Sequence, residues 1–230
     1  MPTLSIVIPA YNEERFIGTL LQQVGAVPLH TIGVDTEVIV VDDCSTDRTS
    51  DIARGVDGVR LFRLASNSGK GAAVRAGIAQ ATGDYLIIQD ADLEYDPQDY
   101  LPMMQAILDR RADVVYGSRY LGKGRHAGQG LAAYLGGRSL SLVMLATTGT
   151  YLTDTVTALK LFPRSLLPSL ALETSGFETD HEITAKVLAR GLRIVEVPVT
   201  YKPRSKEEGK KIGLRDWFIG VRTFWHYRNG

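Results

Sequence analysis

Residues 83–94 read Gly83-Asp84-Tyr85-Leu86-Ile87-Ile88-Gln89-Asp90-Ala91-Asp92-Leu93-Glu94. The apolar run at the start is typical of a buried strand, and three carboxylates, Asp90, Asp92 and Glu94, follow its carboxyl end. Residues 90 and 92 of an extended segment lie on the same side, and residue 94 is near enough to join them. Hard oxygen ligands favour Mg²⁺ or Mn²⁺, which usually bridge carboxylates to substrate phosphates. The alternative is a solvated Asp-rich turn that precedes a helix starting at Asp96-Pro97.

Strand-like runs and helical patterns alternate on both sides of this stretch. Strands are predicted at 4–9, 37–43, 59–64, 83–89 and 113–118, and helices at about 14–24, from 45 onward, at 69–81 and at 98–109. Continuous apolar strands separated by helices indicate an α/β fold, with a mostly parallel central sheet and helices on both faces. Ligands of such sheets bind beyond the carboxyl ends of the strands.

Length and composition limit the classes of protein. A chain of 230 residues suits one large α/β domain, and its 26 basic and 26 acidic residues balance, which gives no support for a nucleic-acid partner. Cys44 is the only cysteine, which excludes an internal disulfide and fits a reducing compartment. No apolar run approaches the ~20 residues that span a bilayer, and no signal peptide is recognisable. We therefore expect a cytoplasmic protein, or one peripheral to the cytosolic face of a membrane.

Polar residues follow each of the five predicted strands. Lys70 and Arg119 would supply positive charge at this edge, and Gly69 and Gly71 would let the backbone approach a phosphate closely. Each segment alone is better explained as a turn or a helix cap, but their combination predicts a site for a phosphorylated ligand. The spacing around Lys70 matches neither an ATPase loop nor a dinucleotide-binding loop.

Several ordered motifs resemble inverting glycosyltransferase family 2, in particular its dolichol-phosphate mannose synthase and polyprenyl-phosphate hexosyltransferase branch. The resemblance covers nearly the whole chain and is carried by residues 5–13, 41–47, 67–71, 89–94, 117–120, 176–178 and 197–204. It implies a single GT-A-type, Rossmann-like catalytic domain over 1–230. Within it, 1–120 would bind the nucleotide sugar, 121–200 would bind the acceptor, and 201–230 would form a basic loop and an amphipathic helix.

The resemblance also implies roles for individual residues. Asp90, Asp92 and Glu94 would surround the metal, Mg²⁺ or Mn²⁺, where relatives often have Gln in place of Glu94. The basic residues Arg204 and Lys210 would close over the diphosphate from a mobile loop, although the composition of 204–211 alone also fits a solvated linker. The full set expected to bind the nucleotide sugar is Pro9, Tyr11, Glu13, Val41, Asp43, Lys70, Asp90, Ala91, Asp92, Arg204 and Lys210.

The implied reaction is metal-dependent transfer of a hexose, mannose or glucose, from a GDP- or UDP-sugar to a polyprenyl or dolichyl phosphate. Such an acceptor is already anionic and needs no strong base, and Arg119 and Arg138 would hold its phosphate. With a hydroxyl acceptor, Asp180 would take the proton; its alternative role is to cap a helix. Asp92→Ala should then abolish turnover with any acceptor, whereas Asp180→Asn should be nearly silent with a lipid phosphate.

Other functions remain open at this point. A sugar-phosphate nucleotidyltransferase would also need a metal and phosphate site on a similar sheet, but it would release pyrophosphate. A nucleotide-sugar-binding module without activity is disfavoured because every expected metal carboxylate is present. Asp154 and Lys160 lie in a segment that departs from the family pattern, which leaves the donor sugar open; the two are interpreted either as contacts near the sugar or as a surface ion pair.

The C-terminal segment has an apolar stripe at helical spacing, flanked by basic residues. Leu214, Trp217, Phe218, Val221 and Phe224 belong to it, with Trp225 beside them. Tryptophans and cations on an amphipathic helix suit a membrane interface. Packing against the α/β core is the alternative, so peripheral contact with a membrane is one of two interpretations.

Overall fold

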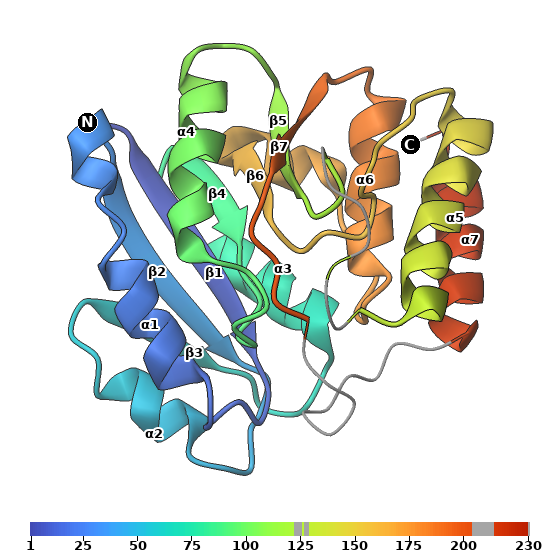
Figure 1. The fold of residues 1–230 in the computed structure, drawn as a ribbon. Helices are drawn as coiled ribbons and strands as arrows, with labels where there is room; N and C mark the ends of the chain where they lie inside the picture. Colours follow the sequence, from blue (N-terminus) through green and yellow to red (C-terminus); the bar gives the residue numbers. More distant parts are fainter. Residues whose placement is uncertain (122–125, 127–128, 204–213, 230) are drawn as a thin grey trace.

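The computed structural model describes residues 1–121, 126, 129–203 and 214–229. In this part of the chain a seven-stranded sheet carries helices on both faces (Figure 1). The strands are β1 (Thr3–Ala10), β2 (Asp35–Asp42), β3 (Val59–Arg63), β4 (Tyr85–Ile88), β5 (Val114–Ser118), β6 (Lys160–Pro163) and β7 (Ile194–Pro198). The α-helices are α1 (Ile17–Gly25), α2 (Thr49–Arg54), α3 (Lys70–Gln80), α4 (Tyr100–Leu108), α5 (Leu131–Thr148), α6 (Thr179–Ala189) and α7 (Leu214–Tyr227), and short 3₁₀ segments occupy Leu29–Ile32, Pro97–Asp99 and Arg164–Leu170.

The sheet has the order β3-β2-β1-β4-β6-β5-β7. All neighbouring strands run parallel except at β6, which is antiparallel to both β4 and β5. The prediction of an α/β domain with a mostly parallel sheet is confirmed. Because β6 runs the other way, its first residue, Lys160, lies opposite Ile88 at the carboxyl end of β4.

Two apolar layers enclose the sheet, one on each face. Ile6 and Ile8 of β1 pack with residues of α1 and α4, whereas Val7 of the same strand packs with residues of α3 and α6. The side-chain period of two in a strand explains this division. A strand covered on both faces must be apolar along its length, as the sequence of β1 is.

The helices α5, α6 and α7 form a smaller apolar cluster of their own, and α5 and α7 lie side by side (Figure 1). Phe224 of α7 is completely buried there, whereas Phe218 and Trp225 of the same helix are 66% and 60% exposed. The helix predicted for the C-terminus is therefore present. One side of this helix packs on the protein and the other faces outward, and contact of the outer side with a membrane stays a prediction. Among the described helices, none combines the length and apolar character needed to cross a bilayer.

Candidate functional site

The segments that follow β1, β2 and β4 each contain a residue in the left-handed region. Asn12 has φ 55°, Cys44 has φ 63° and Leu93 has φ 58°. This conformation costs a residue with a side chain about 1–2 kcal/mol. Since β2, β1 and β4 are neighbours in the sheet, three strained turns lie along one edge. Backbone strain of this kind concentrates at functional sites, and this is the edge where the sequence predicts the ligand.

The turns after β1 and β2 are tied to each other by hydrogen bonds. The amide of Asn12 donates to Ser45 Oγ at 2.9 Å, and the amide of Glu13 donates to Thr49 Oγ1 at 2.8 Å. Of the residues expected to hold the base and ribose, Tyr11 is 42% exposed, which leaves its ring accessible.

Two other residues of that predicted set are buried in the sheet. Pro9 and Val41 are paired in register on β1 and β2, and Val41 is completely buried. Their side chains therefore belong to the core in this conformation. Ala91, between the two aspartates, is also buried, at 3% exposure.

The loop before α3 is held by Asp43 rather than left open for a phosphate. The Asp43 carboxylate accepts hydrogen bonds from the amides of Ser68 and Gly69 at 2.7 and 2.8 Å. Beyond Lys70, the amides of Gly71 and Ala72 donate to the carbonyl oxygen of Ser175 at 2.7 and 3.3 Å. Four amides at this helix start, those of Ser68, Gly69, Gly71 and Ala72, are thus already bonded within the protein.

The glycines of this loop serve packing, and the approach of a phosphate to their backbone stays a prediction. A Cβ at Gly71 would lie 1.9 Å from Thr179 Oγ1 and 2.6 Å from the carbonyl oxygen of Thr174. A Cβ at Gly69, where φ is +91°, would lie 2.4 Å from the carbonyl oxygen of Ser175. The absence of side chains lets the segment 174–176 approach α3, and this contact joins the first half of the chain to the second.

A cluster of four charged side chains lies at the centre of the site. Lys70 Nζ is 2.8 Å from Asp90 Oδ1 and 3.0 Å from Asp180 Oδ2. The other Asp180 oxygen, Oδ1, is 2.9 Å from Lys160 Nζ, and Lys160 is completely buried. Four elements supply these groups: α3, the end of β4, β6 and α6. Lys160 is therefore part of a buried cluster and not of a surface ion pair.

Electrostatics in this cluster favour the charged forms of Asp180 and Lys70, whereas burial lowers the pKa of Lys160 despite its contact with Asp180. Burial raises the pKa of Asp180, but the ammonium groups of Lys160 and Lys70 outweigh burial and hold that pKa well below its ordinary value. Burial lowers the pKa of Lys70, but the charges of Asp180 and Asp90 raise it above its ordinary value. A carboxylate with so low a pKa is a weak proton acceptor, so Asp180 in this arrangement is poorly suited to act as a general base.

Asp90, Asp92 and Glu94 are not gathered into one group. Among the described residues, no set of three or more His, Cys, Asp or Glu side chains is close enough to hold a metal ion. Glu94 Oε2 accepts a hydrogen bond from Tyr201 Oη at 2.9 Å, and Asp92 Oδ1 accepts one from the Glu94 amide at 3.2 Å. Mg²⁺ in phosphate-transfer sites needs one or two carboxylates, with substrate phosphates and water as its remaining ligands. The donor chemistry of Asp90 and Asp92 fits such an ion, and Glu94 as a further ligand stays a prediction.

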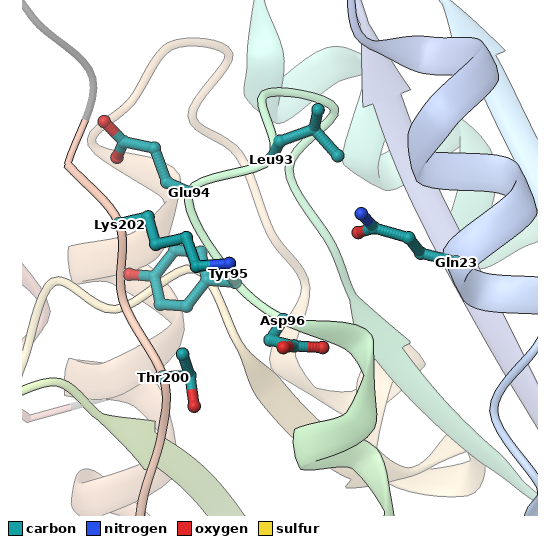
Figure 2. A pocket seen from close by; sticks show the side chains of 7 residues that line it. All are labelled: Gln23, Leu93, Glu94, Tyr95, Asp96, Thr200 and Lys202. Atoms are coloured by element: carbon teal, nitrogen blue, oxygen red, sulfur yellow. The ribbon is translucent and has the colours of Figure 1, made fainter.

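A small hollow of about 200 Å³ adjoins the metal motif. In Figure 2, Glu94 and Asp96 reach it from the segment after β4, Thr200 and Lys202 from the segment after β7, and Gln23 from α1. The amide of Lys202 donates to the carbonyl oxygen of Glu94 at 2.8 Å, which joins the two segments. The hollow does not include Lys70 or Asp180. The sequence predicted neither Tyr201 nor this junction.

The two arginines expected to hold an acceptor phosphate have different environments. Arg119 is bound to Asp154 by Nε at 2.6 Å and by Nη2 at 2.7 Å, and Asp154 is 1% exposed. Its guanidinium therefore already has a carboxylate partner, and this pair is buried. Arg138 on α5 donates to the carbonyl oxygen of Thr153 at 2.9 Å and to the Tyr151 hydroxyl, which leaves it at the edge of the site.

Two glutamates, the completely buried Glu182 and the half-buried Glu196, organise the second half of the site, and neither has a leading role in the sequence-based prediction. Glu196 of β7 accepts hydrogen bonds from the amides of Thr153 and Asp154, which fixes the carboxylate partner of Arg119. Glu182 of α6, completely buried, accepts from the amides of Glu173 and Thr174. A single acid in an otherwise apolar strand was the available signal for Glu196. The predicted loop residues Arg204 and Lys210 lie outside the described residues.

The chain is similar to sugar transferases from archaea and bacteria. It is 30% identical over 207 residues to the low-salt glycan biosynthesis hexosyltransferase Agl6 of Haloferax volcanii, which covers 90% of this chain and 49% of that protein. It is 35% identical over 244 aligned positions to dodecaprenyl-phosphate galacturonate synthase of Rhizobium johnstonii, which covers 98% of this chain and 68% of that protein. The chain thus spans about half the length of the haloarchaeal relative.

The fold is shared with solved structures of GT-A glycosyltransferases. Glucosyl-3-phosphoglycerate synthase from Mycobacterium tuberculosis, in complex with Mn²⁺, UDP-glucose and phosphoglyceric acid, superimposes with a TM-score of 0.73 at 21% identity. The superposition covers 99% of this chain and 80% of that one. Residues 5–161 match the family model for glycosyl transferase family 2. This match spans most of the chain, and the chain belongs to glycosyltransferase family 2.

Proposed function

We propose that this protein transfers a hexose, with inversion, from a nucleoside diphosphate sugar to a polyprenyl phosphate. Membership of family 2 supports sugar transfer and argues against a nucleotidyltransferase. The name of the rhizobial relative, dodecaprenyl-phosphate galacturonate synthase, supports a polyprenyl phosphate acceptor. The observation that carries the proposal is the pair Asp90 and Asp92 directly after β4, beside the ammonium group of Lys70.

In the proposed reaction, the bond between the anomeric carbon and the diphosphate breaks and its electron pair stays on the diphosphate oxygen. An oxygen of the acceptor phosphate forms the new bond from the opposite face of the sugar. A divalent ion held by Asp90 and Asp92 would neutralise charge on the leaving diphosphate. Lys70 adds a fixed positive charge next to these carboxylates.

The charges around Asp180 favour a phosphate acceptor over a hydroxyl acceptor. A hydroxyl must lose its proton to a base during transfer, whereas a phosphate oxygen is already anionic at neutral pH. Asp180 is paired with two ammonium groups and its pKa is held low, so it would accept a proton poorly. Since the candidate base is weak, an acceptor that needs none suits this site better.

The first experiment is a thermal-shift panel of GDP-mannose, UDP-glucose, UDP-galacturonate and the free nucleotides, each with Mn²⁺ and with EDTA. A ligand that binds only the folded state raises the unfolding temperature. We expect one sugar nucleotide to give a metal-dependent shift, and Asp92→Ala to abolish it. Transfer is then measured with that donor and a radiolabelled sugar.

The acceptor class is decided by where the label goes. With undecaprenyl phosphate as acceptor, we expect label in the organic phase after extraction. Label that stays in the aqueous phase with a hydroxyl acceptor, and never with the lipid phosphate, would contradict the proposed acceptor. If no sugar nucleotide shifts the transition in either condition, the proposed donor class is wrong.

A further inference from the structure

Lys70 occupies an unusual position for a cation. It is the first residue of α3, where the partial positive charge of the helix start disfavours an ammonium group. Its side chain is nevertheless only 12% exposed, and its Nζ lies within 3.0 Å of both Asp90 and Asp180. The attraction to Asp90 and Asp180 therefore outweighs the unfavourable interaction of the ammonium group with the start of α3.

The two carboxylates that pair with Lys70 differ in how easily they can lose their contact with it. Asp180 is also bound by Lys160, which is completely buried and has no route to solvent. Asp90 lies at the end of β4, with its side chain 24% exposed, and belongs to the predicted metal motif. If Lys70 gives up Asp90, it keeps Asp180, so neither ammonium group is left buried without a carboxylate. One of the two contacts can thus open at low cost.

We propose that Lys70 acts as a built-in counter-cation of the metal site and makes the divalent ion and the nucleoside diphosphate bind as a pair. Without ligands, its ammonium group neutralises Asp90 and competes with the ion for that carboxylate. When a diphosphate arrives, its oxygens supply new acceptors for Lys70, and Asp90 becomes available to the ion. The inference rests on the proposed function, since it deepens the same donor site.

This role has a thermodynamic signature that a merely structural lysine lacks. If the ion and the diphosphate share Lys70, each must increase the affinity for the other by the same factor. Removal of the ammonium group should raise the affinity of the protein for the ion in the absence of diphosphate. It should also reduce the factor by which the diphosphate tightens binding of the ion. A lysine that only stabilised the fold would change neither quantity in this direction.

The test is Mn²⁺ binding, followed by the electron paramagnetic resonance signal of the free ion, with and without UDP or GDP. In the wild type we expect the effective diphosphate to tighten Mn²⁺ binding by about tenfold or more, within the usual range of coupling between sites. In Lys70→Met we expect Mn²⁺ alone to bind about tenfold more tightly than in the wild type, and the diphosphate, which still supplies ligands to the ion, to tighten binding by a smaller factor than in the wild type. No turnover is needed for either readout.

Two further variants complete the test. Lys202→Met removes an exposed cation close to Glu94 (Figure 2), and we expect the wild-type coupling to persist because salt screens exposed charges. Lys70→Arg keeps a cation at position 70, should retain the coupling, and serves if Lys70→Met fails to fold.

The outcomes separate this inference from the proposed function. If Lys70→Met binds Mn²⁺ alone no more tightly than the wild type while the diphosphate still tightens binding, the counter-cation role is wrong and the donor site stands. If Lys70→Arg loses the coupling, the role is equally wrong. If neither the wild type nor Lys70→Met binds Mn²⁺ in any condition, both the metal site and the role of Lys70 are wrong.

Discussion

Asp180 accepts hydrogen bonds from lysines on two different elements, Lys70 of α3 and Lys160 of β6. The sequence alone led us to expect that Asp180→Asn would be nearly silent with a lipid phosphate, because a carboxylate base is not needed there. The structure adds an effect on stability to that expectation about activity. The charge of Asp180 is needed for the fold even where it is not needed for the chemistry.

Asp180→Asn should destabilise the protein by about 3 kcal/mol or more, because a completely buried Lys160 loses its carboxylate partner. Urea unfolding at pH 7 measures the change. Asp51→Asn is the matched control, since the Asp51–Arg54 pair is exposed and should contribute less than about 1 kcal/mol. Equal unfolding midpoints for the two variants would contradict the role assigned to Asp180.

His181 should make the free energy of unfolding depend on pH in a predictable way. In the described part of the protein, neither ring nitrogen has a hydrogen-bond partner, and burial lowers the pKa of His181 to about 4. The unfolded chain, with a pKa near 6.5, takes up the proton first as the pH falls. The free energy of unfolding should therefore decrease as the pH falls from about 6.5 towards 4, by up to ~1.4 kcal/mol per pH unit.

His181→Leu isolates this effect. Between pH 7 and pH 5 the free energy of unfolding of the variant should decrease less than that of the wild type, and the other histidines cancel in the comparison. Denaturant titrations at several pH values provide the measurement. Parallel pH profiles for the two proteins would mean that His181 is protonated or hydrogen-bonded in the folded state.

At the scale of single residues, the sequence predicted that Lys70 and Asp90 lie at the same edge of the sheet, but not that they pair with each other and with Asp180. Asp90 follows a buried strand and Lys70 begins a helix, and both patterns are local. The third member, Asp180, comes from a helix far along the chain. Periodicity in the sequence reports local structure only, so it cannot predict a contact between residues so far apart in sequence. The same limit explains Gly71, whose neighbour Ser175 lies in another part of the sequence.

At the scale of elements, the contact between α3 and the segment before α6 holds the two halves of the site together. Gly71 is the point of closest approach, and a Cβ there would overlap Thr179 and Thr174. Local patterns predicted α3 correctly. Local patterns could not predict how α3 packs, because a glycine at a helix start is consistent both with a close contact to another segment and with an approaching phosphate.

Gly71→Ala should lower the free energy of unfolding by about 3 kcal/mol, at the upper end of the range for overpacking, because backbone atoms in the segment must move. Gly136→Ala in α5 is the control. A Cβ there meets nothing within 4 Å, so the better helix propensity of alanine should stabilise the protein by up to ~1 kcal/mol. Thermal and urea unfolding of both variants provide the comparison. A Gly71→Ala protein as stable as the wild type would mean that the segment is loosely held.

At the scale of the whole molecule, exposed apolar side chains concentrate on one pair of helices. Large exposed hydrophobic residues on α5 and α7 are Leu131, Leu135, Leu142, Leu145, Phe218 and Trp225. These helices lie side by side (Figure 1), and α7 also exposes Arg215 and Arg222. Apolar side chains next to cations suit the surface of an anionic membrane, where a polyprenyl phosphate would be met.

The double variant Phe218→Ser and Trp225→Ser should bind vesicles that contain anionic lipid several-fold more weakly than the wild type, because both rings lose their contact with the bilayer. Co-sedimentation measures the bound fraction. The unfolding temperature of the double variant should stay close to that of the wild type, since both side chains are mostly exposed. Vesicles of neutral lipid alone serve as the control for the charge contribution. Unchanged binding to anionic vesicles would contradict the proposed contact.

The sheet order has a consequence for how the protein is made. When residue 118 leaves the ribosome, β1 to β4 can pair with one another, but β5 has neither of its neighbours, because β6 ends at Pro163 and β7 at Pro198. Until β6 has been made, the nascent chain presents an open apolar edge at β4. Such an edge is a target for chaperones and for wrong strand pairing. The first 120 residues are therefore not expected to be a folding unit, and a gene split at that point should yield a fragment that aggregates unless the second half is translated with it.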